Sequence, residues 1–265
     1  APLSGIPGTV GAAPVQNIGA YGAEVAELIA SVRAWDRLRN RVVWLALGEL
    51  GLAYRDSRLK QSLTDTEVGG GRLWGPTGRW VVLDATFAVR QGSLSSRIAY
   101  SQLAGALGVE LGERVPEREL REAVLELRRS KGMVLDGADH DTWSAGSFFI
   151  NPILTTEQAE QLPEGAPRFP VTDHSQVVLG TKAAPVIEGL VKTSAAWLID
   201  HAGFSKGFAV EAGAPAGLST KHVLALTNRG GATGADLARL RDAVVAGVRE
   251  RYGVTLVPEP VQVGF

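Results

Sequence analysis

The 265-residue sequence contains no cysteine, and this absence excludes several kinds of chemistry at once. Without thiols a chain has no disulfides, no thiolate metal ligands and no cysteine nucleophile. The four histidines are scattered without the spacing of a zinc site, so we expect no metal. Neither thiol chemistry nor metal chemistry is therefore expected of this chain.

An excess of charge of one sign is also missing. The 27 Lys and Arg residues balance 28 Asp and Glu residues, which leaves a net charge of -1 and no bulk field for nucleic acid or an anionic membrane. Apolar runs are only as long as strands, and the first residues lack the pattern of an export signal. We therefore expect a cytoplasmic protein without nucleic-acid or membrane partners, in which individual Lys and Arg side chains hold any anionic ligand.

The residue patterns that are present predict separate runs of strands and helices, which is typical of an α+β fold. The expected strands cover residues 24–44, with a break at 36–40, and residues 81–89 and 254–263. The expected helices cover residues 116–130, 155–161, 194–202 and 233–252, the last opened by the capping pair Thr233 and Asp236 and ended by Gly253. Residues 165–190 show no clear period and are expected to form a connection or an insertion.

The stretch from Gly5 to Gly22 is dense in glycine, which lets a backbone approach a flat or phosphorylated ligand closely. Its spacing is not that of the dinucleotide-binding fingerprint, and no strand precedes it. The chain also has no Gly-Lys-Ser/Thr sequence, so it has no P-loop. The spacing alone leaves a structural loop and a ligand cradle equally open.

A second motif spans residues 144–152, where small residues expose Ser147 between aromatic anchors and an Asn-Pro turn. Such a hydroxyl can donate a proton or contact a ligand, and an ordinary strand entry is the alternative. The sequence Gly203-Phe204-Ser205-Lys206-Gly207 matches the nucleophile elbow of hydrolases, but a helix rather than a strand is expected before it. We do not expect a serine hydrolase.

Taken together and in order, these segments resemble the UDP-N-acetylenolpyruvoylglucosamine reductase (MurB) family. The resemblance rests on the collinear set of residues 5–22, 54–57, 128–131, 146–152, 195–200, 206–207, 226–228 and 256–259. It implies a reductase that uses NADPH through bound FAD to convert UDP-N-acetylglucosamine enolpyruvate to UDP-N-acetylmuramate for peptidoglycan synthesis. That chemistry needs donors aimed at a developing negative charge and an acid that protonates carbon.

The resemblance also implies roles for individual residues. Ser147 resembles the proton donor, Glu259 its electrostatic partner, and Arg55 a guanidinium near the flavin and the substrate carboxylate. The residues implied in substrate binding are Tyr100, Lys131, Asn151, Lys206 and His222. Those implied in cofactor binding are Ile6, Pro7, Gly11, Ala12, Ala13, Ile18, Gly19 and Gly22.

In this family residues 1–132 would complete the FAD-binding domain, 133–254 would form the substrate-binding domain, and 255–265 would be a strand returning to the flavin. The sequence departs from the family pattern in three places. The spacer 132–146 is long and is expected to shift Lys131. Phe169 stands where the family can have a tyrosine, and residues 177–190 look inserted. The family's N-terminal FAD-binding subdomain is not among these 265 residues.

We therefore expect weak FAD binding and negligible turnover from the chain alone, and a monomer when the protein is full length. Another reductase of the same FAD-binding superfamily and a non-catalytic UDP-sugar-binding fragment remain as alternatives.

Overall fold

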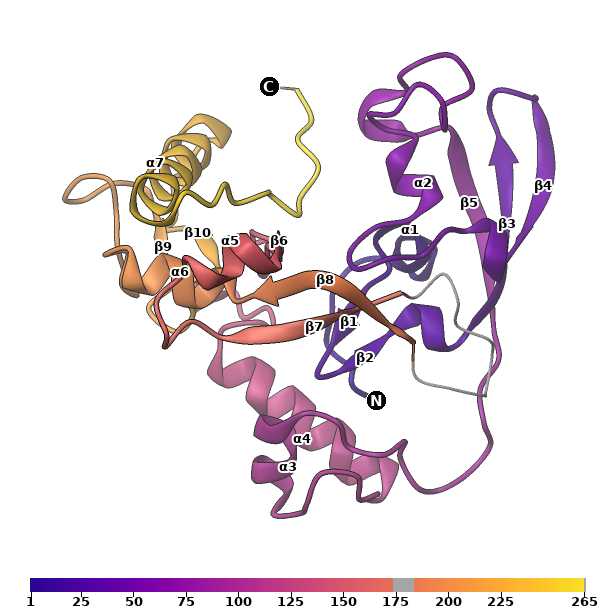
Figure 1. Ribbon diagram of the computed structural model, residues 1–265, viewed down its shortest axis with the longest axis horizontal. Helices are drawn as coiled ribbons and strands as arrows, with labels where there is room; N and C mark the ends of the chain where they lie inside the picture. The colour runs from indigo at the N-terminus through magenta and orange to yellow at the C-terminus, as the bar shows by residue number, and fades with distance from the viewer. Residues whose placement is uncertain (174–183, 265) are drawn as a thin grey trace. The chain divides into compact units, whose positions relative to one another are not determined.

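The computed structural model describes residues 1–173 and 184–264, and the chain divides into two compact units (Figure 1). Unit 1 comprises Ala1–Leu127 and Thr172–Pro185, and unit 2 comprises Arg128–Val171 and Val186–Phe265. Helices and antiparallel strands occupy separate stretches of the chain, so the predicted α+β class is confirmed. Among the helices of the described residues, none is long and apolar enough to cross a membrane.

The centre of unit 1 is a three-stranded antiparallel sheet in the order β4 (Arg41–Ala46), β3 (Ile29–Asp36) and β5 (Trp80–Phe87). From Val32 to Asp36, strand β3 buries alternate residues, as a strand with one face on a core does. Its buried side chains pack with Leu50, Leu52 and Leu59. The strands predicted at 24–44 and 81–89 are thus confirmed, with the break at the turn between β3 and β4.

Short elements and two longer helices complete unit 1. The short elements are η1 (Val10–Ala12), α1 (Ala13–Gln16), β1 (Gly19–Ala20), β2 (Ala23–Glu24), η2 (Val25–Glu27), η3 (Leu47–Glu49), α2 (Arg58–Gln61) and η4 (Gly75–Thr77). The longer helices are α3 (Ser101–Leu107), which the sequence did not predict, and α4 (Glu117–Ser130), which it did. Leu103 on α3 and Leu120 and Val124 on α4 are buried in one cluster, which explains how these helices hold together.

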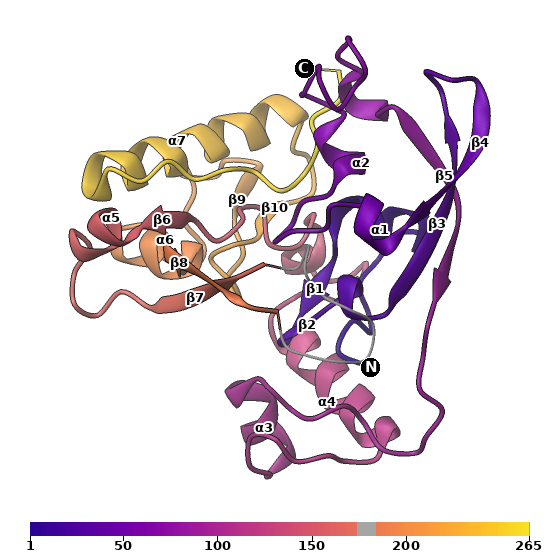
Figure 2. The ribbon, with the colours of Figure 1, turned by 45° about the vertical axis from the view of Figure 1, so that its right-hand side comes forward.

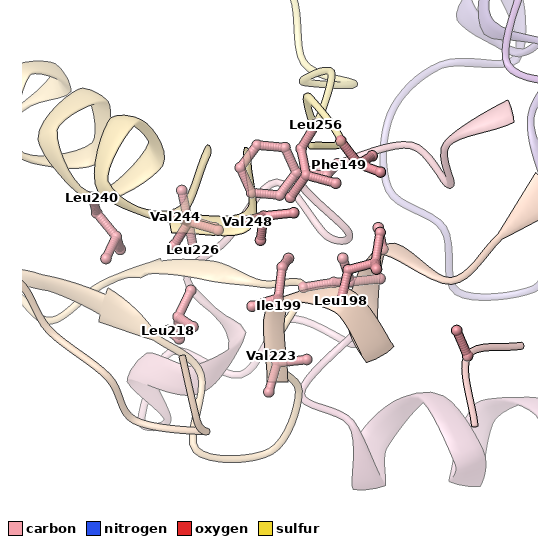
Figure 3. Close-up of a cluster of buried hydrophobic side chains, with 14 of the residues drawn as sticks. Phe149, Leu198, Ile199, Leu218, Val223, Leu226, Leu240, Val244, Val248 and Leu256 are labelled. Atoms are coloured by element: carbon pink, nitrogen blue, oxygen red, sulfur yellow. The ribbon is translucent and has the colours of Figure 1, made fainter. Parts of the chain in front are cut away.

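Unit 2 contains a sheet in the order β6 (Ile153–Thr155), β8 (Val186–Thr193) and β7 (Arg168–Thr172), and a hairpin of β9 (Ala216–Leu218) and β10 (Leu226–Asn228). Its helices are η5 (His140–Thr142), α5 (Thr156–Glu160), α6 (Ala195–His201) and α7 (Gly234–Tyr252). Helix α7 lies along one side of the unit and contacts β9, β10 and α6 (Figure 2). Together they bury one core, shown in Figure 3, which includes Phe149, Leu198, Ile199, Leu218, Leu226, Leu240, Val244, Val248 and Leu256.

The helix ends of unit 2 follow the capping residues in the sequence. Thr155 accepts a hydrogen bond from the backbone N of Gln158 at the start of α5. Thr233 and Asp236 form a reciprocal capping box at the start of α7, and Gly253 ends that helix with a φ of 68°. These predictions are confirmed, because caps depend only on residues within one turn of the helix.

Two segments differ from the sequence-based expectation. Residues 254–263 are not a strand: they form one isolated bridge, between Pro258 and Phe149. Pro258 and Pro260 have no N–H group, so a continuous ladder of hydrogen bonds is impossible there. The stretch 165–190 is not all connection, because it contributes β7 and the first half of β8; the predicted insertion at 177–190 lies partly outside the described residues.

Candidate active site

The residues predicted to act at the site fall into two sets, one in each unit. Unit 1 carries Arg55, Tyr100 and the predicted cofactor-binding residues Ile6, Pro7, Gly11, Ala12, Ala13, Ile18, Gly19 and Gly22. Unit 2 carries Lys131, Ser147, Asn151, Lys206, His222 and Glu259.

The glycine-rich opening of unit 1 ends in a tight hairpin between β1 and β2. Tyr21 and Gly22 form its turn with φ of 51° and 79°, the left-handed conformation that a two-residue hairpin turn requires. Asn17, completely buried at the end of α1, ties the hairpin to the rest of the unit. Its Nδ2 donates to Glu24 Oε2 (2.9 Å) and to the carbonyl oxygen of Ala53 (2.7 Å).

The Arg55 guanidinium lies directly on this hairpin. Its Nη2 donates to the carbonyl oxygen of Gly19 (2.7 Å), and its Nη1 lies 3.4 Å from Glu24 Oε1. A Cβ atom at Gly19 would come within 2.9 Å of both the backbone oxygen of Ala23 and Arg55 Nη1, closer than real Cβ contacts, so this position needs glycine. The structure thus brings together Arg55, predicted for catalysis, and Gly19, predicted for cofactor binding.

The turn that presents Arg55 is itself firmly anchored. Arg55 has a φ of 55°, a conformation that a non-glycine residue adopts only when its surroundings enforce it. Ser57, which is fully buried, accepts a hydrogen bond from the backbone N of Lys60 and donates to the carbonyl oxygen of Val15 (2.6 Å). The guanidinium is therefore pre-positioned rather than free to search for its place.

Tyr100 precedes helix α3 and packs edge-on against Tyr21 of the hairpin, with ring centroids 5.6 Å apart. Its side chain keeps substantial exposure, which leaves a ligand contact open to it. The predicted contact with a diphosphate stays a prediction.

The segment before the hairpin leaves part of its backbone exposed. Pro7, Gly8 and Ala12 are exposed, and a Cβ atom placed on Gly8 would meet no atom within 4 Å. Because little side-chain bulk covers this backbone, its amide groups can approach a ligand closely.

Among the described residues there is no cluster of three His, Asp or Glu side chains that could hold a metal ion.

In unit 2, backbone hydrogen bonds fix the Ser147 segment beside the Glu259 segment. The backbone N of Glu259 donates to the carbonyl oxygen of Phe148 (2.8 Å), and that of Ile150 to Val257 (3.1 Å). Phe149, which pairs with Pro258, is anchored in the core of the unit (Figure 3). Glu259 therefore lies opposite Phe148, the neighbour of Ser147.

Asn151 has a structural partner in the same unit. Its Oδ1 accepts a hydrogen bond from the backbone N of Ala195 (3.0 Å), the first residue of helix α6. This bond satisfies one of the amides that a helix start leaves without an intrahelical partner. The predicted contact between Asn151 and the substrate stays a prediction beside this role.

Three predicted cationic or titratable residues form a cluster in unit 2. Burial, and then the positive charges of Lys131 and Lys206, lower the pKa of His222 to about 4. The pKa of Lys131 is also lowered, first by burial and then by the charge of Arg128. Two lysines thus lie near an imidazole that is uncharged at neutral pH, an arrangement suited to a phosphate-bearing anion.

The long spacer after Lys131 folds back on itself, and the expected shift of Lys131 stays a prediction. Thr142 Oγ1 accepts a hydrogen bond from the backbone N of Asp136, which closes the loop between these two residues. Gly132 lies against the backbone of Asp141, and a Cβ atom there would come within 2.9 Å of the Asp141 carbonyl oxygen. Lys131 remains close enough to His222 for its charge to act on the imidazole.

Unit 2 also contains an apolar hollow of about 560 Å³ that the sequence did not indicate. The residues lining it are Leu135, Gly137, Thr142, Trp143, Ser144, Ala145, Phe148, Leu226, Asn228 and Leu237. It adjoins the Ser147 segment through its neighbour Phe148.

Comparisons with known proteins identify the family of the chain. Residues 138–263 match the family described as "UDP-N-acetylenolpyruvoylglucosamine reductase, C-terminal domain". Curated proteins of that name are similar along 99% of this chain: those of Cutibacterium acnes and Streptomyces coelicolor are each 50% identical, and that of Thermobifida fusca is 48% identical. This chain spans 61%, 63% and 67% of their respective lengths.

A solved structure, that of UDP-N-acetylenolpyruvylglucosamine reductase (MurB) from Thermus caldophilus, is 20% identical to this chain. The alignment covers 97% of this chain and 61% of that one, with a TM-score of 0.49. On the strength of the curated relatives, the chain belongs to the UDP-N-acetylenolpyruvoylglucosamine reductase (MurB) family.

Proposed function

We propose that the chain acts in the NADPH- and FAD-dependent reduction of UDP-N-acetylglucosamine enolpyruvate to UDP-N-acetylmuramate. This step supplies a precursor of peptidoglycan, on which cell-wall growth, cell shape and cell division depend. The observation that carries the proposal is the backbone pairing that holds Glu259 opposite Phe148, beside Ser147. This pairing brings the segment that carries a hydroxyl group beside the segment that carries a carboxyl group, and these are the groups that a proton transfer to carbon needs.

Bound FAD, reduced by NADPH, would supply the hydride that adds to the terminal carbon of the enolpyruvyl group. The neighbouring carbon then carries negative charge that is shared with the substrate carboxylate. Ser147 gives its hydroxyl proton to that carbon, so that the O–H bond breaks and a C–H bond forms. Glu259 stabilises the developing charge from beside Ser147, in a protonated or hydrogen-bonded form.

The charged residues would hold the two anionic parts of the substrate. Lys131 and Lys206 suit the diphosphate or the carboxylate, and neutral His222 can still donate or accept a hydrogen bond there. Arg55, fixed on the hairpin, suits the flavin and the substrate carboxylate. Tyr100 and Asn151 are proposed as further substrate contacts.

The glycine-rich opening of unit 1 would hold FAD through its exposed backbone. The proposed contacts are those predicted from the sequence: Ile6, Pro7, Gly11, Ala12, Ala13, Ile18, Gly19 and Gly22. Residues 1–132 would then belong to a FAD-binding domain and residues 133–254 to a substrate-binding domain. This proposal is supported by the exposure of the loop and by the place of Arg55 on Gly19.

A specific observation favours a second candidate, a UDP-sugar-binding fragment without reductase activity. Lys131, Lys206 and His222 all lie within unit 2, so that unit carries the cationic cluster proposed to hold the nucleotide sugar. The chain also spans only 61% to 67% of the three relatives described above.

Absorbance spectra and turnover assays separate the two candidates. The chain is purified alone and also joined to the family's N-terminal FAD-binding subdomain, and each is tested for a flavin band and for NADPH oxidation with the enolpyruvyl substrate. We expect weak colour and negligible turnover alone, and a yellow, active protein when joined. A joined protein that binds the nucleotide sugar but neither flavin nor NADPH supports the fragment, and one that binds none of them contradicts both candidates.

A further inference from the structure

A buried carboxylate of the spacer loop stands at the point where three chain segments meet. Asp141 is 5% exposed and accepts hydrogen bonds from both the backbone N (2.9 Å) and the hydroxyl of Thr220. It also forms an ion pair with Arg229, whose Nη1 lies 2.9 Å from Asp141 Oδ1. Burial alone would raise the pKa of this carboxyl, but the hydrogen bonds from Thr220 and the charge of Arg229 hold it below its usual value.

Two contacts of Asp141 lead to residues near Lys131 and His222, and the segment of Lys206 is reached through Thr220 and its neighbour Ser219. Gly132, which follows Lys131, packs on the Asp141 backbone, and Thr220 is two residues before His222. Gly207, which follows Lys206, donates its N–H to the carbonyl oxygen of Ser219 (3.2 Å). A Cβ atom on Gly207 would meet Thr220 Cγ2 at 3.6 Å, so this segment lies against Thr220 as well.

The turn that carries His222 is closed by its own hydrogen bonds and therefore moves as one piece with Thr220. The buried Ser219 Oγ accepts from the backbone N of both Lys221 (3.0 Å) and His222 (3.3 Å). The backbone N of Ser219 in turn donates to the carbonyl oxygen of Ala225 (2.8 Å). A shift of Thr220 thus displaces His222, and with it the segment of Lys206.

We infer that Asp141 is a positioning residue for the diphosphate site, holding the segments of Lys131, Lys206 and His222 together through Thr220. The inference rests on the proposed function for the identity of the ligand, whereas the assembly of the cluster is a property of unit 2 itself. Asp141 does not contact the ligand. It fixes the spacing of the groups that do.

Calorimetric titration with UDP-N-acetylglucosamine enolpyruvate and NMR titration of the His222 ring test this on the full chain. Asp141→Ala removes all three interactions, so the affinity should fall by about tenfold or more. The His222 pKa, which burial and then the two lysines lower to about 4, should rise as the lysines move away from it. Thr220→Val removes only the hydrogen bond from the Thr220 hydroxyl to Asp141 and should give smaller changes in the same directions. This variant replaces Asp141→Ala as the test if Asp141→Ala fails to fold.

Two further variants serve as comparisons. Asp141→Asn keeps an acceptor for the Thr220 amide and should preserve most of the affinity and a low His222 pKa. Asp242→Asn makes the same change at an exposed position on α7 and should alter neither measurement. Folded Asp141→Ala or Thr220→Val proteins with unchanged affinity and unchanged His222 pKa would overturn the inference. If the unaltered chain does not bind the nucleotide sugar, the proposed function fails, while the His222 titration still decides the positioning role.

Discussion

Loss of one partner of the buried ion pair between Asp36 and Arg79 should strongly destabilise unit 1. Asp36 is completely buried and Arg79 is 5% exposed. Two parallel hydrogen bonds join them, from Nε to Oδ1 (3.0 Å) and from Nη2 to Oδ2 (2.7 Å). Asp36 also accepts from the backbone N of Leu38 (3.0 Å), at the turn between β3 and β4.

Asp36→Ala leaves the Arg79 guanidinium buried without its carboxylate. Removing one partner of a buried pair costs about 3–5 kcal/mol, because the remaining charge loses its compensation in a poorly solvated site. The same sheet offers a matched control, the pair of Arg33 and Asp84, whose side chains are 43% and 42% exposed. Asp84→Ala should cost only about 0–1 kcal/mol, because water solvates the remaining charge.

Urea unfolding followed by tryptophan fluorescence measures both free energies of unfolding. Replacing Arg79 by Met in the Asp36→Ala background should recover part of the loss, because the uncompensated charge is then gone. The reasoning is refuted if Asp36→Ala and Asp84→Ala destabilise the protein equally, or if the Met replacement makes the loss larger.

Three further predictions concern the site and its supports. Gly19→Ala should displace Arg55 and lower reductase turnover in the protein joined to its N-terminal subdomain, whereas Gly48→Ala, where a Cβ atom would meet nothing within 4 Å, should not. Because the folded-state pKa of His222 is lowered to about 4, the unfolded state binds more protons below about pH 6.5. Stability should therefore fall as the pH falls from about 6.5 to about 4, and a His222→Gln variant that lost as much stability over that range would contradict this. Thr233→Ala should cost about 1 kcal/mol of unfolding free energy in urea through loss of the α7 cap, and an unchanged midpoint would argue against a capping role.

The sequence predicted most reliably those features that depend on neighbouring residues. Thr233 with Asp236 begins α7 and Gly253 ends it, because each acts within one helical turn. Strands β7 and β8 were missed, because much of β8 is exposed and so shows no burial period of two. The prediction of a closing strand at 254–263 was wrong. It relied on the hydrophobic residues of this segment and gave too little weight to its prolines, which have no N–H group to donate to a strand ladder.

The candidate site was predicted by resemblance more than by physical reasoning. Lys131, Lys206 and His222 lie far apart in the sequence, and no local pattern shows that the chain brings them together. The supports of the site were missed for the same reason. Asn17 and Asp141 are buried polar residues whose partners are distant in sequence, and only the folded chain shows that they have them.

The role of Ser147 as proton donor is the central claim, and stopped-flow absorbance tests it most directly. In Ser147→Ala, joined to the N-terminal subdomain, flavin reduction by NADPH should be nearly normal, since no proton is yet delivered to carbon. Flavin reoxidation by UDP-N-acetylglucosamine enolpyruvate should slow by about 10²-fold to 10⁴-fold, the usual contribution of a positioned acid. Ser205→Ala, a matched change at an exposed serine of the same unit, should leave both half-reactions intact. Substrate-driven reoxidation at the normal rate in Ser147→Ala would contradict the account.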